Sequence, residues 1–562
     1  MLNEQTELLE LQKWSKANDH SWLEKDISTL KLEELDKVSV DVVYGGAFSI
    51  KDYYMESGNP RQMRGASQLL QDVVEEYKYK KNVYLFCGAT SFSIVEPGEG
   101  EKVARELEKT FREKTLTAQA VAVWQSTTVK KLLSENHFKK LWTCLNEAFS
   151  ERRMLVFLPL ELPEHKVINE SGYIFPSNDK SRCSRCNYRE SAYIAKMDKR
   201  YEGEFLLCPV CAYREDRGSY LERTDYKQRC MDFSKKEWRV EKIEGCDEED
   251  KHWPHGTKDI ADANGDFALL YADINNLGGA GKSLGGAVSK RKSFCEAVQG
   301  TVEDALYTAV SDVMQFYKAQ ENAEELRAKF EIIAMGGDDI CVLLPGEVAL
   351  AAGTLLLQKF DELWEKRPKE ELPGLTISAG IAIGKANTPI AYMHKAAEQL
   401  LKLAKEKSLE NDCSCVDILS LKNDGQWAVE IKKKLRENLK KQEGNETALL
   451  TMRPFTVDKA EKVLRCLQKY NISASTLYNI AEASLRCGIS EGDLWFKYLL
   501  SRQKKDDEDP KELTQEKDDG DLKALADEYN CDMYERGGKT YSPWRDLAEL
   551  RDQKWGGGHK DE

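Results

Sequence analysis

The feature that most constrains the fold is an acidic turn between two apolar runs, in the segment KFEIIAMGGDDICVLLP at residues 329–345. Each run is long enough for a β-strand, and Gly336 and Gly337 permit the backbone angles that a hairpin turn requires. Asp338 and Asp339 follow these glycines directly. The segment therefore predicts two neighbouring strands that present two carboxylates at one edge of a sheet.

A third carboxylate lies upstream of this turn. Asp273 ends another apolar strand, FALLYADIN at 267–275, and a long helix at 294–318 separates it from the turn. If the strands are neighbours in one sheet, the three carboxylates converge on one edge. Such hard oxygen ligands suit two Mg²⁺ (or Mn²⁺) ions, which activate a 3′-hydroxyl and stabilise a leaving pyrophosphate. The alternative is an ordinary polar turn.

The strand and helix order around these carboxylates occurs twice in the chain. The first copy has strands at 38–48, NVYLFCG and AQAVAVW, with helices at 62–79 and 99–114. The second copy continues beyond the acidic turn with a helix at 347–366, a strand at 375–384, a helix at 389–408 and a strand at 415–421. A β-α-β-β-α-β order is that of ferredoxin-like, or palm, domains. We therefore expect an α+β chain with two palm domains.

The length of 562 residues fits three to four domains of about 150 residues each. We expect an N-terminal helical segment, a degenerate first palm, a zinc-binding insert, a second palm with the GGDD turn and a C-terminal helical domain, at 1–38, 39–175, 176–262, 263–422 and 423–562. The charged tract at 504–521 reads as a solvated loop or linker.

The insert is defined by two pairs of cysteines. Cys183 and Cys186 form one C-x₂-C pair, Cys208 and Cys211 form another, and 21 residues separate the pairs. This is close to zinc-ribbon spacing, in which each tight turn offers two thiolates to a tetrahedral Zn²⁺. A redox pair is the alternative, but it needs only one C-x₂-C. Four cysteines leave no open coordination position, so this zinc is expected to be structural.

Composition limits the environment and the partners. The net charge of −14 is unfavourable for wrapping bare nucleic acid over the whole surface. No apolar run reaches the roughly 18 residues that a bilayer span needs, and the acidic N-terminus MLNEQTELLELQKW lacks the features of a signal peptide. We therefore expect a cytoplasmic protein with no membrane partner, whose 15 cysteines are mostly reduced.

The unit from YADINNLGG through MGGDDICVLLP to ISAGIAIGKANTPIAYMHKAAEQLLKLAK resembles the palm of nucleotidyl cyclases and polymerases. More specifically, it resembles the large polymerase/cyclase-like subunit of type III CRISPR effector complexes. The turn reads GGDD without a following Glu-Phe, a cysteine-rich insert separates two palms, and helices follow the second palm. The segment VVYGGAFSIKDYYMESGNPRQMRGASQLL at 42–70 also resembles that family's first palm. The resemblance covers about 39–425.

The resemblance implies that only the second palm is catalytic, with Asp273, Asp338 and Asp339 as catalytic and Mg²⁺-binding residues. The first palm has the turn Cys87-Gly88-Ala89-Thr90, without a carboxylate, so it is expected to be a pseudo-two-fold partner that helps to hold a second nucleotide.

Five residues are expected to bind nucleotide, namely Gly336, Gly337, Ser67, Lys282 and Lys405. We expect Ser67 at a helix N-terminus, where it bonds a phosphate or ribose or simply caps the helix. Lys405 occupies the position of a phosphate-binding lysine in palm cyclases, with a solvated helix lysine as the alternative. Lys282 lies in the glycine-rich segment 277–286, which departs from the Walker pattern because Asn276 replaces its first glycine.

The function that the resemblance implies is synthesis of a nucleotide second messenger from ATP. Activation is expected when a complex with other type III effector subunits, guided by CRISPR RNA, captures target RNA. The product is either a cyclic oligoadenylate or a conjugate of AMP with S-adenosylmethionine. About 38 residues precede the first palm, so the family's histidine-aspartate nuclease domain is expected to be absent. A noncatalytic scaffold of the same complex and a stand-alone cyclase are the alternatives.

Overall fold

A computed structural model describes most of the two palms and parts of the insert and of the C-terminal region. The described residues are 35–80, 83–88, 91–96, 98–155, 172–196, 204–218, 254, 256–283, 288–318, 328–336, 338–367, 372–421, 439–443, 446–469, 473–487, 494, 495, 498 and 539–554. The helix expected within 1–38 falls outside them except for the 3₁₀ turn η1 (Leu35–Lys37), and so does the charged tract at 504–521.

The first palm is a four-stranded antiparallel sheet with the order β2-β3-β1-β4. Its elements are β1 (Ser39–Phe48), α3 (Ile50–Met55), α4 (Pro60–Lys80), β2 (Val83–Gly88), β3 (Ser91–Glu96), α5 (Gly100–Thr115), β4 (Gln119–Thr128), α6 (Val129–Leu133) and α7 (Glu135–Met154). This strand order confirms the ferredoxin-like fold. Alternate residues of β1 face opposite layers, so Val43 packs with α4 and α5 while Val42 packs with α6 and α7.

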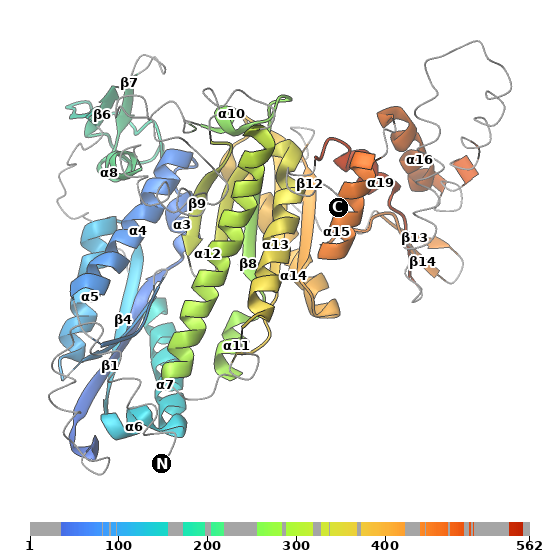
Figure 1. Ribbon diagram of the computed structural model, residues 1–562. Helices are drawn as coiled ribbons and strands as arrows, with labels where there is room; N and C mark the ends of the chain where they lie inside the picture. The colour runs from blue at the N-terminus through green and yellow to red at the C-terminus, as the bar shows by residue number, and fades with distance from the viewer. Residues whose placement is uncertain are drawn as a thin grey trace.

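The second palm is a six-stranded sheet with the order β15-β12-β11-β8-β10-β9. Its elements are β8 (Asp266–Ile274), α11 (Leu277–Ser283), α12 (Val288–Lys318), β9 (Glu331–Gly336), β10 (Asp339–Pro345), η4 (Gly346–Val348), α13 (Ala349–Glu365), β11 (Ile377–Lys385), α14 (Ile390–Asn411), β12 (Cys415–Ser420) and β15 (Phe455–Thr456). Its four strands β11-β8-β10-β9 repeat the order of the first palm. In Figure 1, α12 and α13 run side by side across one face of this sheet.

The two faces of β8 belong to different parts of the core. Ala268, Leu270 and Ala272 are buried with α12 and α13. Their neighbours Leu269 and Tyr271 are buried with α14 and with side chains of the first palm, because successive residues of a strand point to opposite faces. The two palms therefore share one continuous hydrophobic cluster.

The insert is a small sheet followed by a helix, and Figure 1 shows it beside α4. Its elements are β5 (Ile174–Pro176), β6 (Tyr193–Lys196), β7 (Glu204–Leu207) and α8 (Pro209–Arg217), and the short helix α10 (Thr257–Ile260) precedes β8. The strands pair in sequence order. This arrangement confirms the expected compact cysteine-bearing insert between two palms.

Helix α4 begins earlier than the sequence interpretation placed it. Pro60 has the fixed φ suited to a first helical position, and Asn59 Oδ1 accepts hydrogen bonds from the backbone N–H groups of Arg61 and Gln62 at 3.1 and 3.4 Å. Ser67 therefore lies inside the helix. The prediction that Ser67 lies at a helix N-terminus is wrong, both for phosphate binding there and for capping.

A glycine in α4 is explained by close contact with the insert. A Cβ atom at Gly65 would lie 1.9 Å from the backbone oxygen of Arg214 in α8. Reciprocally, a Cβ atom at Gly218 would lie 2.0 Å from the backbone oxygen of Arg61. The two backbones approach so closely that no larger residue fits at either glycine.

Gly65→Ala is expected to lower the midpoint of thermal unfolding, because the new methyl group forces α4 and α8 apart. Overpacking of this kind costs about 1–3 kcal/mol. Gly374→Ala is the matched control, since Gly374 is exposed and has no atom within 4 Å of the added Cβ. Differential scanning calorimetry measures both variants, and equal midpoints would contradict the close contact.

The C-terminal region attaches to the second palm through Arg453, which also forms a buried ion pair within that region. Its described elements are β13 (Lys440–Glu443), β14 (Glu446–Leu449), α15 (Val457–Lys469), α16 (Ala474–Cys487), β16 (Lys539–Tyr541) and α19 (Trp544–Leu550). Arg453 donates to Asp546 Oδ1 at 2.8 Å and to the Ile418 carbonyl of β12 at 2.8 Å. The helices were expected, whereas the sheet β13-β14-β16 was not.

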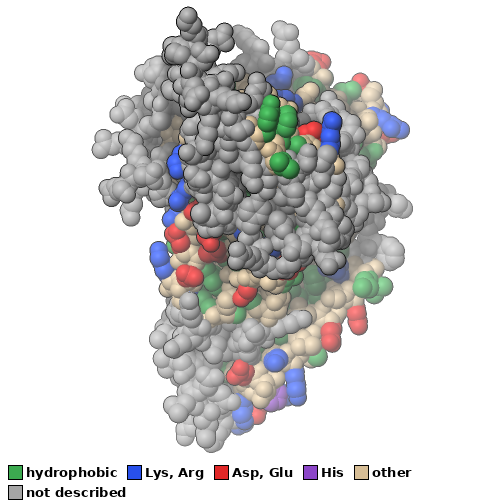
Figure 2. Space-filling view, turned by 90° about the vertical axis from the view of Figure 1, so that its right-hand side faces the viewer, with side chains coloured by type: hydrophobic (Ala, Val, Ile, Leu, Met, Phe, Trp, Pro, Cys, Tyr) green, Lys and Arg blue, Asp and Glu red, His purple; other side chains and the backbone are tan. Residues whose placement is uncertain are grey.

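Figure 2 shows the side of the molecule that carries this region, where described acidic and basic side chains are interspersed. The described part of this face therefore offers no continuous basic stripe for nucleic acid. Among the helices that the structure describes, none has both the length and the apolar character that crossing a bilayer requires.

Candidate functional site

The sheet register brings two of the expected carboxylates, Asp273 and Asp339, to the same end of the sheet. We call this end, which also carries Asp338, the carboxylate edge. Strand β10 runs antiparallel to β8 with Ile340 opposite Ala272, so the next residues along each strand are Asp339 and Asp273. Asp338 lies in the turn that joins β9 to β10. The three aspartates therefore occupy one end of two adjacent central strands, as the sequence interpretation required.

Asp273 is paired with the lysine that was expected to bind phosphate. Lys405 Nζ, from α14, lies 2.6 Å from Asp273 Oδ2. Burial raises the pKa of Asp273, and the positive charge of Lys405 opposes that rise. Lys405 is thus not simply a solvated helix lysine, because its ammonium group faces the carboxylate edge.

The pKa of Asp338 is raised by burial and by the negative charges of the neighbouring aspartates. Burial, followed by the charges of Asp273 and Asp339, raises its pKa to about 7. Crowded carboxylates of this kind are stabilised when a cation neutralises them. The local electrostatics therefore favour a divalent cation.

Asp339 is held by two residues that the sequence interpretation missed. The Tyr271 hydroxyl donates to Asp339 Oδ1 at 2.8 Å, and Lys51 Nζ lies 3.8 Å from the same oxygen. Tyr271 is two residues before Asp273 on β8 and so shares its face, which is a periodicity signal that could have found it. Lys51 comes from α3 of the first palm, and nothing in the local sequence indicates that it reaches the second palm.

The donor set fits Mg²⁺ or Mn²⁺, which prefer carboxylate oxygens. Asp273, Asp338 and Asp339 would hold such ions. Within the described part of the chain, however, the four cysteines of the insert are the one group of possible ligands whose atoms all lie within 4.8 Å of one another. The three aspartates do not form such a group there, and Lys405 and Lys51 lie against two of them, so metal binding would require these side chains to rearrange.

The remaining nucleotide-binding candidates are placed only in part. Gly336 ends β9, and Gly337 lies outside the described residues. The first part of the glycine-rich segment after β8 forms the helix α11. Lys282 lies in this helix, and its side chain is outside the described residues. Ser67 lies within α4 rather than at its N-terminus.

The four cysteines of the insert come together as their spacing predicts. Cys183, Cys208 and Cys211 are buried, Cys186 is half-buried, and all four are free thiols. The backbone N–H of Cys211 donates to Cys208 Sγ at 3.4 Å. Four thiol ligands in so small a space fit tetrahedral zinc.

The fold and the carboxylate edge define a palm-domain protein. Residues 266–414 match the family model described as Cas10/Cmr2, second palm domain. This match confirms, for this segment, the resemblance drawn from the sequence to the large subunit of type III effector complexes. No curated protein matches the chain.

Solved structures of Csm1 are similar to the chain at low identity. "Crystal structure of Csm1 in T.onnurineus" is 12% identical, with 92% of this chain and 70% of that chain covered and a TM-score of 0.49. "Crystal structure of Csm1-Csm4 cassette in complex with cA3" and the same cassette "in complex with one ATP" are each 13% identical, with TM-scores of 0.47. In both, 83% of this chain and 65% of the other are covered, so the chain spans less than two thirds of their length.

Proposed function

We propose that this chain is the target-RNA-activated nucleotidyltransferase of a type III CRISPR effector complex, and that it makes a nucleotide second messenger from ATP. The observation that carries the proposal is the carboxylate edge formed by Asp273, Asp338 and Asp339 within a Cas10/Cmr2-type palm. The product is a cyclic oligoadenylate or a conjugate of S-adenosylmethionine with AMP. Other effector subunits hold the CRISPR RNA and the target RNA.

The chain's own residues bind and orient the reactants. Mg²⁺ at the three aspartates would supply activation of the attacking hydroxyl and stabilisation of the leaving pyrophosphate. Tyr271 fixes one oxygen of Asp339, which leaves the other oxygen to a metal. Lys405 places a positive charge at the same edge, where it favours a bound triphosphate.

A mass-spectrometric assay tests this proposal. The purified complex is incubated with ATP, S-adenosylmethionine and Mg²⁺, with and without target RNA. An AMP-containing product that forms only with target RNA supports the proposal, and its mass identifies the acceptor. A complex that binds target RNA but makes no product would favour the scaffold alternative. Product formation by the isolated chain without RNA would favour a stand-alone cyclase.

Lys405→Met is expected to raise the KM for ATP about tenfold or more, because a charge-assisted contact to phosphate is lost. Lys402→Met is the matched control, since Lys402 lies on the same helix with its side chain 66% exposed. Steady-state kinetics at saturating Mg²⁺ separate KM from kcat. An unchanged KM would assign Lys405 to orienting Asp273 alone.

A further inference from the structure

The short helix α3 extends from the carboxylate edge to the insert. Lys51, near its first residue, faces Asp339, and Glu56, which follows its last residue, faces the insert. The first palm lacks metal-binding carboxylates of its own at the equivalent turn. Through α3 it nevertheless contributes a charged group to the second palm.

At the end of α3 that faces the carboxylate edge, the Lys51 side chain lies beside Asp339. Its ammonium lies 3.8 Å from Asp339 Oδ1 and 4.7 Å from the centre of the Tyr271 ring. An ammonium group and a divalent cation at one carboxylate repel each other, so each weakens the binding of the other. The Lys51 side chain is 38% exposed, so it has room to withdraw.

At the other end, the insert binds Glu56 with residues adjacent to its cysteines. Arg214 of α8 lies 2.8 Å from Glu56 Oε2, and Tyr188 and Arg189 also donate to this carboxylate. Arg189 is three residues beyond Cys186, and α8 begins directly after Cys208. The cysteine cluster therefore fixes the groups that hold the end of α3.

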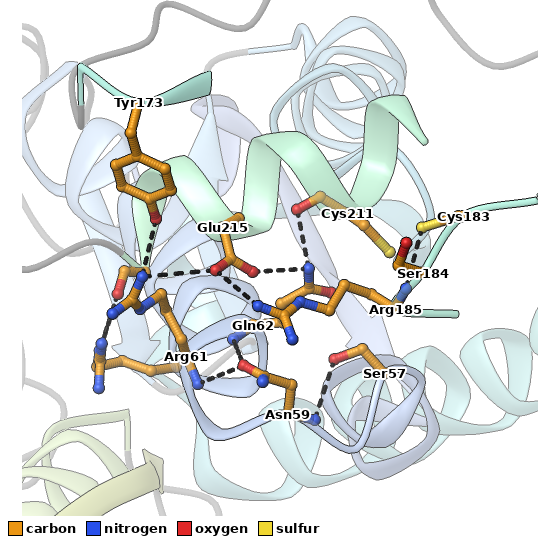
Figure 3. A network of polar contacts seen from close by, with 12 residues as sticks. Ser57, Asn59, Arg61, Gln62, Tyr173, Cys183, Ser184, Arg185, Cys211 and Glu215 are labelled. Atoms are coloured by element: carbon orange, nitrogen blue, oxygen red, sulfur yellow. Dashed lines mark hydrogen bonds and ion pairs between the residues drawn. The ribbon is translucent and has the colours of Figure 1, made fainter. Parts of the chain in front are cut away.

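A buried network makes the insert and α4 one rigid unit. Figure 3 shows Glu215 of α8 at its centre, approached by Gln62, Arg61 and Arg185 at 2.9, 3.5 and 3.4 Å. The Glu215 side chain is only 1% exposed, so these contacts are shielded from water and salt. A displacement of the insert would therefore also displace α4 of the first palm.

A second connection reaches the other strand of the acidic hairpin. Arg64 of α4 donates to the Gly218 carbonyl of the insert at 3.2 Å and to Glu331 of β9 at 2.7 Å. Glu331 begins the strand that ends at the GGDD turn. The insert is thus linked to β9 through Arg64 and to Asp339 through α3.

We propose that Lys51 is a positioning residue that competes with divalent metal at Asp339, and that the insert sets its place through Glu56 and α3. Displacement of the insert relative to the sheet then changes the metal affinity of the carboxylate edge. The proposal rests on the proposed function for the identity of that edge, and it assigns to the insert the regulation of metal occupancy.

Mn²⁺ titration followed by electron paramagnetic resonance, without nucleotide, tests Lys51 directly. Lys51→Met is expected to tighten Mn²⁺ binding about threefold or more, since a like charge leaves the site. Lys51→Arg retains the charge and should bind Mn²⁺ as the wild-type protein does. Lys102→Met, at an exposed lysine of α5 in the same palm, is the control. Damage to the fold would weaken binding, so unchanged or weaker binding by Lys51→Met overturns the proposal.

The connection to the insert is tested by a double-mutant cycle. Glu56→Gln is expected to tighten Mn²⁺ binding in the wild-type background and to have no further effect when combined with Lys51→Met. Arg189→Gln removes one of the two insert ion pairs of Glu56 and leaves that of Arg214, so it serves, with a smaller expected effect, if Glu56→Gln does not fold. Additive effects would overturn the link through α3. The Mn²⁺ affinities are measured without any catalytic turnover. A wild-type complex without activity would therefore refute the proposed function, but the effects of the variants on Mn²⁺ affinity would still test the role of Lys51.

Discussion

Replacing Asp338 and Asp339 together by alanine is expected to abolish product formation while leaving complex assembly and target-RNA binding intact. Catalysis would lose ligands that place metal between the attacking oxygen and the triphosphate, which costs roughly a thousandfold or more in rate. Folding would lose little, because Asp338 lies in the turn and Asp339 at the first position of β10, and because burial and like charges raise the pKa of Asp338. Product formation and RNA binding are measured on the same preparation.

Two further variants sharpen this test. Asp273→Ala should reduce product formation as severely, since Asp273 lies at the end of the adjacent strand. Asp266→Asn is the matched control, because Asp266 is at the opposite end of β8, where it pairs with Lys385 at 3.0 Å. A double variant with a near wild-type rate would exclude the second palm as the active site and restore the scaffold alternative.

Replacing Cys183 and Cys208 together by serine is expected to remove about one Zn²⁺ per chain and to unfold the insert. Structural zinc contributes on the order of 10 kcal/mol to small domains, far more than a sheet of three short strands can supply. Elemental analysis measures the metal, and limited proteolysis within 172–218 measures the unfolding.

Cys144→Ser is the control for this change, because Cys144 is an exposed free thiol on α7. It should retain zinc and resist proteolysis as the wild-type protein does. A zinc-free, fully folded wild-type protein with both cysteine pairs oxidised would contradict the zinc assignment.

The parts that the sequence predicted well depend on short-range patterns. The continuous apolar run in FALLYADIN identified β8, and glycines between apolar runs identified the β9–β10 hairpin. The C-x₂-C spacing predicted the cysteine cluster because two tight turns leave few ways to arrange four thiols. The start of α4 could also have been found, since Asn59 and Pro60 are ordinary signals of a helix N-terminus.

The parts that the sequence did not predict depend on contacts between distant segments. Lys51 and Asp339 are separated by about half of the chain, and Lys51 is flanked by no motif. In the sequence, Gly65 looks like a residue of one helix and nothing more. The structure shows that a glycine is needed there because the backbone of Arg214 in the insert lies so close. Such contacts are set by how the domains pack, which residue periodicity does not encode.

The hydrophobic cluster that joins the palms has a consequence for how the protein unfolds. Tyr53 and Met63 of the first palm are buried in the same cluster as Leu269 and Leu343 of the second. Neither half can open without exposing apolar surface of the other, so their unfolding is coupled into one cooperative transition. The boundary between the palms along the chain is therefore not a boundary in stability, and segment 266–414 expressed alone would present part of this cluster to water as an aggregation-prone surface.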